Sequence, residues 1–144
     1  MVTGHIEYRK ATDNDVTLTY SIKQSSIKHL VEKIWGWDNN FQIDYHRKSF
    51  VPNKTQIIIY GSSEVGFFVV NEYPGKVFIE NILIDPAFQG KGIGTKVLTD
   101  IMTGAANKKV ELQVFKINNR AKQLYDRLGF ETYEQTNLHY KMRK

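Results

Sequence analysis

The stretch from Ile79 to Thr95 constrains the fold of this 144-residue chain more than any other. A largely apolar run ends at Asp85-Pro86, three glycines follow within five residues, and a helical pattern begins at Thr95. This order predicts a strand, a turn, a glycine-rich loop and the N-terminus of a helix.

The glycine-rich loop is typical of a place where the backbone meets an anion. A helix N-terminus presents unpaired N–H groups and the positive end of the helix dipole, and glycine lets the backbone approach a phosphate closely. An ordinary strand-to-helix turn is the alternative interpretation. However, each glycine inside a helix costs roughly 0.5–1 kcal/mol, which is easier to understand if a ligand needs bare backbone there.

The spacing of the glycines excludes two common phosphate-binding loops. A Walker A loop requires G-x-x-x-x-G-K-[ST], and no Lys-Ser or Lys-Thr follows a glycine at that spacing. A dinucleotide fingerprint requires G-x-G-x-x-G, but Thr95 stands where its third glycine belongs. The pattern that remains is Gln89-x-x-Gly92-x-Gly94.

The composition favours one soluble domain over residues 1–144. The chain has no cysteine, so disulfides, thiolate metal sites and a cysteine nucleophile are excluded, and a reducing compartment fits. No signal-peptide pattern follows Met1, and no apolar run approaches the ~20 residues that span a membrane. We therefore expect a cytoplasmic protein that has no membrane partner.

The net charge of +5 and the pI of about 9.3 suit either a nucleic acid or a polyanionic small molecule. The lysines and arginines are scattered, with no run of five or more, so nucleic-acid binding is the weaker interpretation. The four histidines show no metal-ligand spacing, and no metal site is expected. For His46, a surface position is the expectation.

Hydrophobic periodicity and turn residues predict an α/β fold of the mixed α+β kind, in which helices flank both faces of a mixed, mostly antiparallel central sheet. Ser25 or Ser26 could break the first helix. The Trp35-Gly36-Trp37 corner is read most simply as a pair of core anchors. The expected strands are 6–10, 56–60, 65–70, 77–84, 110–115, 130–134 and 138–142, and the expected helices are 16–35, 38–48, 95–106 and 118–128.

Two motifs carry a resemblance to a known family. The segment Gln89–Gly94 resembles the Q/R-x-x-G-x-G/A acetyl-CoA signature of the GNAT N-acetyltransferase superfamily. Downstream, Asn118–Ala121, Leu124-Tyr125 and Leu128–Phe130 resemble the family's N-x-x-A…LY…GF segment. Both motifs occur in the family's order with a strand between them, and the expected element order is similar to the whole GNAT fold.

The resemblance implies transfer of an acetyl group from acetyl-CoA, as co-substrate, to a primary amine of a small molecule by direct attack through a tetrahedral intermediate. Backbone groups of Ile82 and Ile84 would pair with the pantetheine arm, N–H groups from Gln89 through Thr95 would cradle the pyrophosphate, and Asn118 would bind the arm. A homodimer is a further expectation. The implied cofactor-binding residues are Ile82, Leu83, Ile84, Gln89, Gly90, Lys91, Gly92, Ile93, Gly94, Thr95, Asn118 and Ala121.

Acetyl transfer needs a base for the amine proton and an acid for the departing thiolate. The resemblance makes Tyr125 the candidate acid, whereas without the flanking motif it would be a core aromatic. Glu80 is the candidate base or amine anchor, because it is a charged residue in an otherwise apolar strand. Partial burial beside Phe78 and Ile82 would raise the pKa of Glu80 toward neutrality, which suits a base. The alternative is that Glu80 forms a salt bridge across the sheet.

The acceptor site is expected at Trp35, Trp37, Gln42 and Glu80, since a Trp face attracts an ammonium group by ~0.5–2 kcal/mol. Three other functions stay open: a non-catalytic acyl-CoA-binding regulatory module, acetylation of a protein or peptide amine, and a small nucleic-acid-binding protein. Among amines, the sequence leaves polyamines, amino acids, aminoglycosides, peptide N-termini and protein lysines as alternatives.

Overall fold

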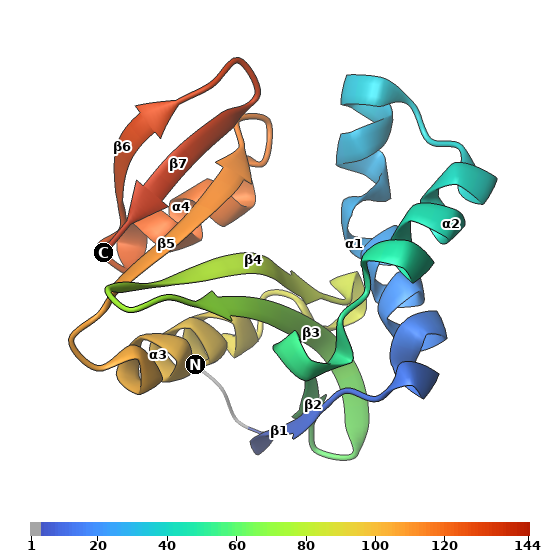
Figure 1. Ribbon diagram of the computed structural model, residues 1–144, viewed down its shortest axis with the longest axis horizontal. Helices are drawn as coiled ribbons and strands as arrows, with labels where there is room; N and C mark the ends of the chain where they lie inside the picture. The colour runs from blue at the N-terminus through green and yellow to red at the C-terminus, as the bar shows by residue number, and fades with distance from the viewer. Residues whose placement is uncertain (1–3) are drawn as a thin grey trace. The chain divides into compact units, whose positions relative to one another are not determined.

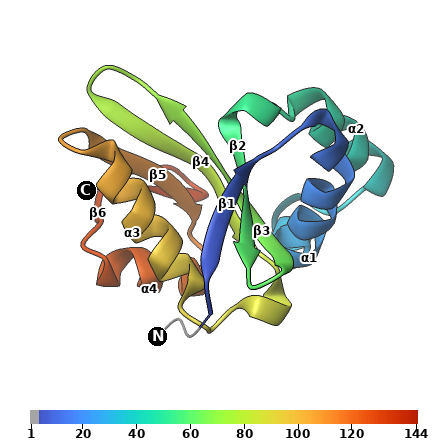
Figure 2. The same cartoon turned by 90° about the horizontal axis from the view of Figure 1, so that it is seen from below.

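The structure is a computed structural model that describes residues 4–144 (Figures 1 and 2). The strands are β1 (Ile6–Lys10), β2 (Thr55–Tyr60), β3 (Ser63–Glu72), β4 (Lys76–Ile84), β5 (Lys109–Phe115), β6 (Glu131–Gln135) and β7 (His139–Arg143), and the helices are α1 (Val16–Trp35), α2 (Asn39–Ser49), α3 (Ile93–Ala105) and α4 (Asn119–Arg127). Residues 4–144 also form three short 3-10 helices, and the one at Pro86–Phe88 leads into the glycine loop.

The strands form a seven-stranded sheet in the order β1-β2-β3-β4-β5-β7-β6. The pairs β1–β2, β2–β3, β5–β7 and β6–β7 are antiparallel, whereas β4 and β5 run parallel with α3 as their crossover. The predicted fold class, a mixed and mostly antiparallel sheet with helices, is confirmed.

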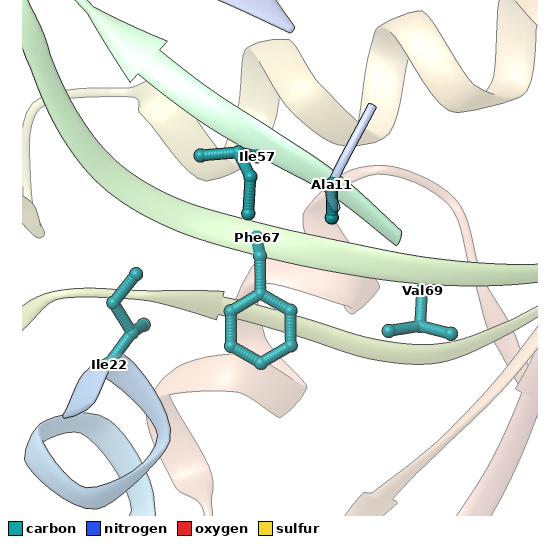
Figure 3. Close-up of a cluster of buried hydrophobic side chains, with 5 residues drawn as sticks. All are labelled: Ala11, Ile22, Ile57, Phe67 and Val69. Atoms are coloured by element: carbon teal, nitrogen blue, oxygen red, sulfur yellow. The ribbon is translucent and has the colours of Figure 1, made fainter. Parts of the chain in front are cut away.

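The chain folds into two compact units. The first holds the chain up to Val69 together with Asn81–Ile93, and the second holds Val70–Glu80 and Gly94–Lys144. The first unit has a buried apolar cluster in which Ile22 of α1 lies against side chains of β2 and β3 (Figure 3). The members of this cluster are Ala11, Ile22, Ile57, Phe67 and Val69.

Helix α1 is continuous over its twenty residues, so the predicted break at Ser25 or Ser26 is wrong. The side chain of Ser26 is buried, and its Oγ donates a hydrogen bond to the Ile22 carbonyl at 2.7 Å. A serine that bonds back to the preceding turn satisfies its hydroxyl without leaving the helix. The helix ends at Gly36, which has φ of 80°.

In the second unit, α4 lies beside β5 in both views (Figures 1 and 2). Alternate residues of β5, Val110, Leu112 and Val114, are buried, as the period-two pattern predicts. Tyr125 of α4 is also buried, and β6 at the sheet edge is exposed along its whole length.

Candidate functional site

The end of β4 is tied to its neighbours by short hydrogen bonds. The Asp85 N–H donates to the Val65 carbonyl at 2.8 Å, and the Asp85 carboxylate accepts the Ala87 N–H at 2.9 Å. Asp85 therefore acts as the N-cap of the Pro86–Phe88 turn, a role for which aspartate is well suited. The strand end and the turn after it consequently form one braced segment.

Gln89 closes this segment onto the strand. Its side-chain Nε2 donates to the Ile84 carbonyl at 2.9 Å, and its backbone N–H donates to the Pro86 carbonyl at 3.3 Å. The Gln89 N–H is thus used within the turn, and its contact with a phosphate stays a prediction. Gln89 braces the loop, and the available backbone begins at Gly90.

The glycine loop requires glycine at two positions. Gly90 and Gly92 have φ of 79° and 83°, in the left-handed region that other residues seldom adopt. Ile93, at 1% exposure, anchors the first turn of α3, whereas Lys91 and Thr95 are exposed. The helix begins at Ile93, two residues before the predicted start, so its first N–H groups lie directly after the loop.

Gly66 of β3 lies against the strand that leads into this loop. A Cβ at Gly66 would meet the Leu83 carbonyl oxygen at less than 3.0 Å and the Ile84 Cα at 3.2 Å. Gly66 is buried and stands opposite Ile58, where the β2–β3 register shifts through a bulge. The sequence gives no signal for this close backbone approach.

In the second unit, Asn118 is the N-cap of α4. Its Oδ1 accepts the Ala121 N–H at 3.2 Å, and both residues are half-buried. Because the carboxamide oxygen serves the cap, the Nδ2 group is the donor that Asn118 can offer to a ligand carbonyl.

Tyr125 lies on the same helix and is 7% exposed. Its ring packs edge-on against Phe130, with ring centroids 5.9 Å apart. Burial raises the pKa of Tyr125 to about 12, so the hydroxyl keeps its proton at neutral pH.

Glu80 is exposed, so the expectation of partial burial is wrong. The buried face of β4 at this point carries Val77 and Ile79, and Glu80 is on the other face, where its Oε2 accepts a hydrogen bond from Asn71 Nδ2 at 3.3 Å. The parallel register of β4 with β5 ends at Ile79 and Leu112, although β4 continues to Ile84. Glu80 therefore comes directly after the last residue of β4 that pairs with β5.

The corner between α1 and α2 is not a core anchor. Trp35 is 63% exposed, and Trp37 is half-buried with its Nε1 donating to Asn39 Oδ1 at 2.8 Å. The interpretation of the two tryptophans as buried anchors is therefore wrong. Gln42, on α2, is half-buried. A corner that reverses the chain in three residues has too little backbone around it to cover two large rings.

His46 is buried at 5% exposure, so its predicted surface position is also wrong. Its Nε2 lies 2.8 Å from Thr19 Oγ1, and its ring packs against those of Tyr20 and Phe50. Burial, with the nearby Lys23 ammonium, lowers the pKa of His46 to about 4. The sequence did hold a signal, because Ile43, His46 and Phe50 recur at helical spacing.

The predicted site residues divide between the two units. The second unit contains Glu80, Gly94, Thr95, Asn118, Ala121 and Tyr125. The first unit contains Ile82, Leu83, Ile84, Gln89, Gly90, Lys91, Gly92, Ile93, Trp35, Trp37 and Gln42. Among residues 4–144, the structure contains no group of three or more His, Cys, Asp or Glu side chains suited to a metal ion. Within the same residues, each helix is too short or too polar to cross a lipid bilayer.

Comparison with known protein families shows to which family the chain belongs. The sequence model described as "Acetyltransferase (GNAT) family" matches residues 23–130, which include the glycine loop and α4. The chain belongs to the acetyltransferase (GNAT) family. GNAT membership thus confirms the resemblance seen in Gln89–Gly94 and in Asn118–Phe130.

Several curated acetyltransferases are similar to parts of this chain. It is 31% identical over 86 residues to the spermine/spermidine N(1)-acetyltransferase of Bacillus subtilis, covering 51% of this chain and 57% of that protein. It is 35% identical over 77 residues to the thialysine N-epsilon-acetyltransferase of Mus musculus, covering 48% and 45%. The chain thus spans about half the length of these curated relatives.

The GNAT fold is matched over almost the whole chain. The crystal structure of the PaiA N-acetyltransferase of Thermoplasma acidophilum, in complex with coenzyme A, superposes with a TM-score of 0.78. The two chains are 18% identical over 97% of this chain and 98% of that one, so this likeness concerns the fold.

Proposed function

We propose that the protein is an N-acetyltransferase that moves the acetyl group of acetyl-CoA to a primary amine of a small molecule. The observation that carries this proposal is the Gln89-braced loop, in which Gly90 and Gly92 are left-handed directly before α3. Family membership supports the same reaction class.

The residues present fit two parts of acetyl-CoA, the pyrophosphate and the pantetheine arm. Backbone N–H groups from Gly90 through Thr95 suit a pyrophosphate, because two glycines leave the backbone uncovered and the helix start contributes further donors. The backbone of Ile82 and Ile84 suits the amides of the pantetheine arm in the manner of an added strand. The Nδ2 group of Asn118 suits a carbonyl of the same arm.

The proposed reaction transfers one acetyl group and one proton. The neutral amine nitrogen attacks the thioester carbon, the carbon–sulfur bond breaks, and the CoA thiolate leaves. The amine proton passes to Glu80, directly or through water, because an exposed carboxylate at the end of the paired strand is open to solvent.

Tyr125 is proposed to serve the leaving thiolate. A thiol ordinarily has a pKa of about 8.5, so full proton transfer to its thiolate from a phenol of pKa about 12 is uphill. Its contribution is therefore a hydrogen bond to the developing charge on sulfur. The raised pKa keeps the proton available for that bond across the neutral range.

A small amine is the acceptor that the relatives' names support, since those of Bacillus subtilis and Mus musculus refer to spermine or spermidine and to thialysine. The exposed Trp35 and the half-buried Trp37 and Gln42 are proposed to contact it. An aromatic face and an amide can hold an ammonium group without a large charge.

The test is release of CoA thiol across a panel of spermidine, lysine, thialysine, an aminoglycoside and a peptide with a free N-terminus. Because the chain has no cysteine, a thiol reagent reports CoA without a protein background. We expect turnover with at least one small amine and none with the peptide. Binding of acetyl-CoA without turnover on any amine would refute the enzyme and indicate a regulatory module.

A further inference from the structure

Helix α2 has one fully buried side chain, that of His46, among its eleven residues, all of which the structure describes. Phe41 and Tyr45 are 63% and 54% exposed, and the Tyr45 ring contacts α1 at its rim, with Lys23 Nζ 5.3 Å from the ring centroid. An amphipathic helix normally buries several apolar side chains, so a helix whose one fully buried side chain is polar is unusual.

The hydrogen bonds around His46 indicate which ring nitrogen carries a proton. Thr19 Oγ1 lies 2.8 Å from the Asp15 carbonyl, to which it donates, and so it accepts from His46 Nε2 at 2.8 Å. His46 therefore carries a proton on Nε2. Its pKa, lowered to about 4 by burial and by Lys23 of α1, keeps the ring otherwise neutral at pH 7.

The chain of bonds continues from Thr19 into the sheet. Asp15, whose carbonyl holds Thr19, accepts two hydrogen bonds from Arg9 at 2.8 Å each and one from the Thr12 N–H at 2.8 Å. Arg9 of β1 also binds Glu64 of β3. The anchor of α2 is thus fixed by two strands of the same unit.

We propose that His46 is a positioning residue that clamps α2 to α1 and so sets the place of Gln42 in the acceptor site. Gln42 and His46 are four residues apart and share a face of α2, so a rotation or shift of the helix moves both. This inference rests on the proposed function, because it takes Gln42 to contact the amine.

Three variants separate the clamp from general packing. His46→Phe keeps a ring but loses the donor, Thr19→Val keeps the volume but loses the acceptor, and His46→Gln keeps an N–H donor near the Nε2 position. The matched control is Tyr20→Phe, because the Tyr20 hydroxyl is buried beside the same ring and has no hydrogen-bond partner within residues 4–144.

We expect His46→Phe and Thr19→Val each to raise KM for the amine about tenfold, because the loss of one buried hydrogen bond changes an equilibrium by about that factor. KM for acetyl-CoA and kcat should stay within about twofold of the wild-type values. His46→Gln should restore most of the amine affinity, and Tyr20→Phe should leave every constant unchanged. Amide hydrogen exchange should accelerate in residues 39–49 of the two impaired variants and not in α4.

The possible failures are distinct. A wild-type protein that acetylates no amine in the panel would refute the proposed function and this inference together. An active wild type with unchanged amine KM in both impaired variants would overturn the inference alone. The inference would also be overturned if both variants raised KM for the amine and for acetyl-CoA equally and lowered kcat in proportion to their folded fraction. Such a result would show that His46 acts through general packing.

Discussion

Replacement of Gly66 by alanine tests how tightly β3 holds the strand that enters the glycine loop. The added Cβ would lie less than 3.0 Å from the Leu83 carbonyl oxygen, a distance that Cβ atoms essentially never adopt, and 3.2 Å from the Ile84 Cα. Both are backbone atoms, so no side-chain rotation can relieve the contact, and the two strands must separate. That separation also lengthens the 2.8 Å bond from the Asp85 N–H to Val65.

The cost follows from these two effects. Overpacking against backbone destabilises by about 1–3 kcal/mol, and the weakened hydrogen bond adds about 1 kcal/mol. We therefore expect Gly66→Ala to lower the free energy of unfolding by about 2–4 kcal/mol, measured by urea denaturation. In the fraction that remains folded, acetyl-CoA affinity measured by calorimetry should fall about tenfold, since the displaced strand end leads directly into the loop.

Gly75→Ala is the matched control. Gly75 lies in the turn before β4, nothing stands within 4 Å of its would-be Cβ, and its φ is not in the left-handed region. This control should stay within about 0.5 kcal/mol of wild type and bind acetyl-CoA normally. Wild-type stability in Gly66→Ala would refute the close approach, and a destabilised variant with unchanged acetyl-CoA affinity would refute the link between strand and loop.

Three further predictions concern the reaction and the pH dependence of stability. Tyr125→Phe should lower kcat about a hundredfold with little change in KM for acetyl-CoA, and unchanged turnover in steady-state assays would remove Tyr125 from the reaction. Glu80→Gln should lower kcat by at least tenfold without weakening acetyl-CoA binding in calorimetry, and an unaltered kcat would leave water as the proton acceptor. His46 has a pKa of about 4, below the ordinary 6.5, so the unfolded chain binds more protons in that range and stability should decline as pH falls from 6.5 to 4. The loss should be at most about 3 kcal/mol. His46→Phe should flatten most of this slope in thermal melts at several pH values, leaving the smaller contribution of His139, whose pKa burial also lowers; an identical slope in that variant would contradict the assignment.

Much of the fold could be predicted because the elements follow their local patterns. The alternation of Val110, Leu112 and Val114 predicted β5, and the Asn118 cap with Gly129 beyond the last turn predicted the limits of α4. The glycine spacing predicted a loop of bare backbone between a strand and a helix, and the structure has that loop, with Gly90 and Gly92 in the left-handed region.

The errors arose where tertiary surroundings decide exposure. Large apolar residues are usually buried, but Trp35 ends a helix beside a reversal of the chain and is exposed. Residue type predicts a surface position for His46, whereas its helical spacing with Ile43 and Phe50 favours the interior, where it lies. The alternation of β4 placed Glu80 on the face opposite Val77 and Ile79, but alternation alone does not say how well that face is covered.

Gly66 could not have been found at all, because a close approach between β3 and the end of β4 is a property of strand packing. The same holds for the Gln89 side chain, which braces the turn through a hydrogen bond to the Ile84 carbonyl.

The exposed corner between α1 and α2 has a consequence for how this protein can change. Trp35 and Phe41 project from the surface, and neither belongs to the buried cluster of Figure 3, so substitutions there remove little core packing. Libraries randomised at these two positions should therefore retain a high proportion of folded members while Gly36 and His46 are kept. If the corner contacts the acceptor as proposed, point mutations there can change the acceptor without a first loss of stability.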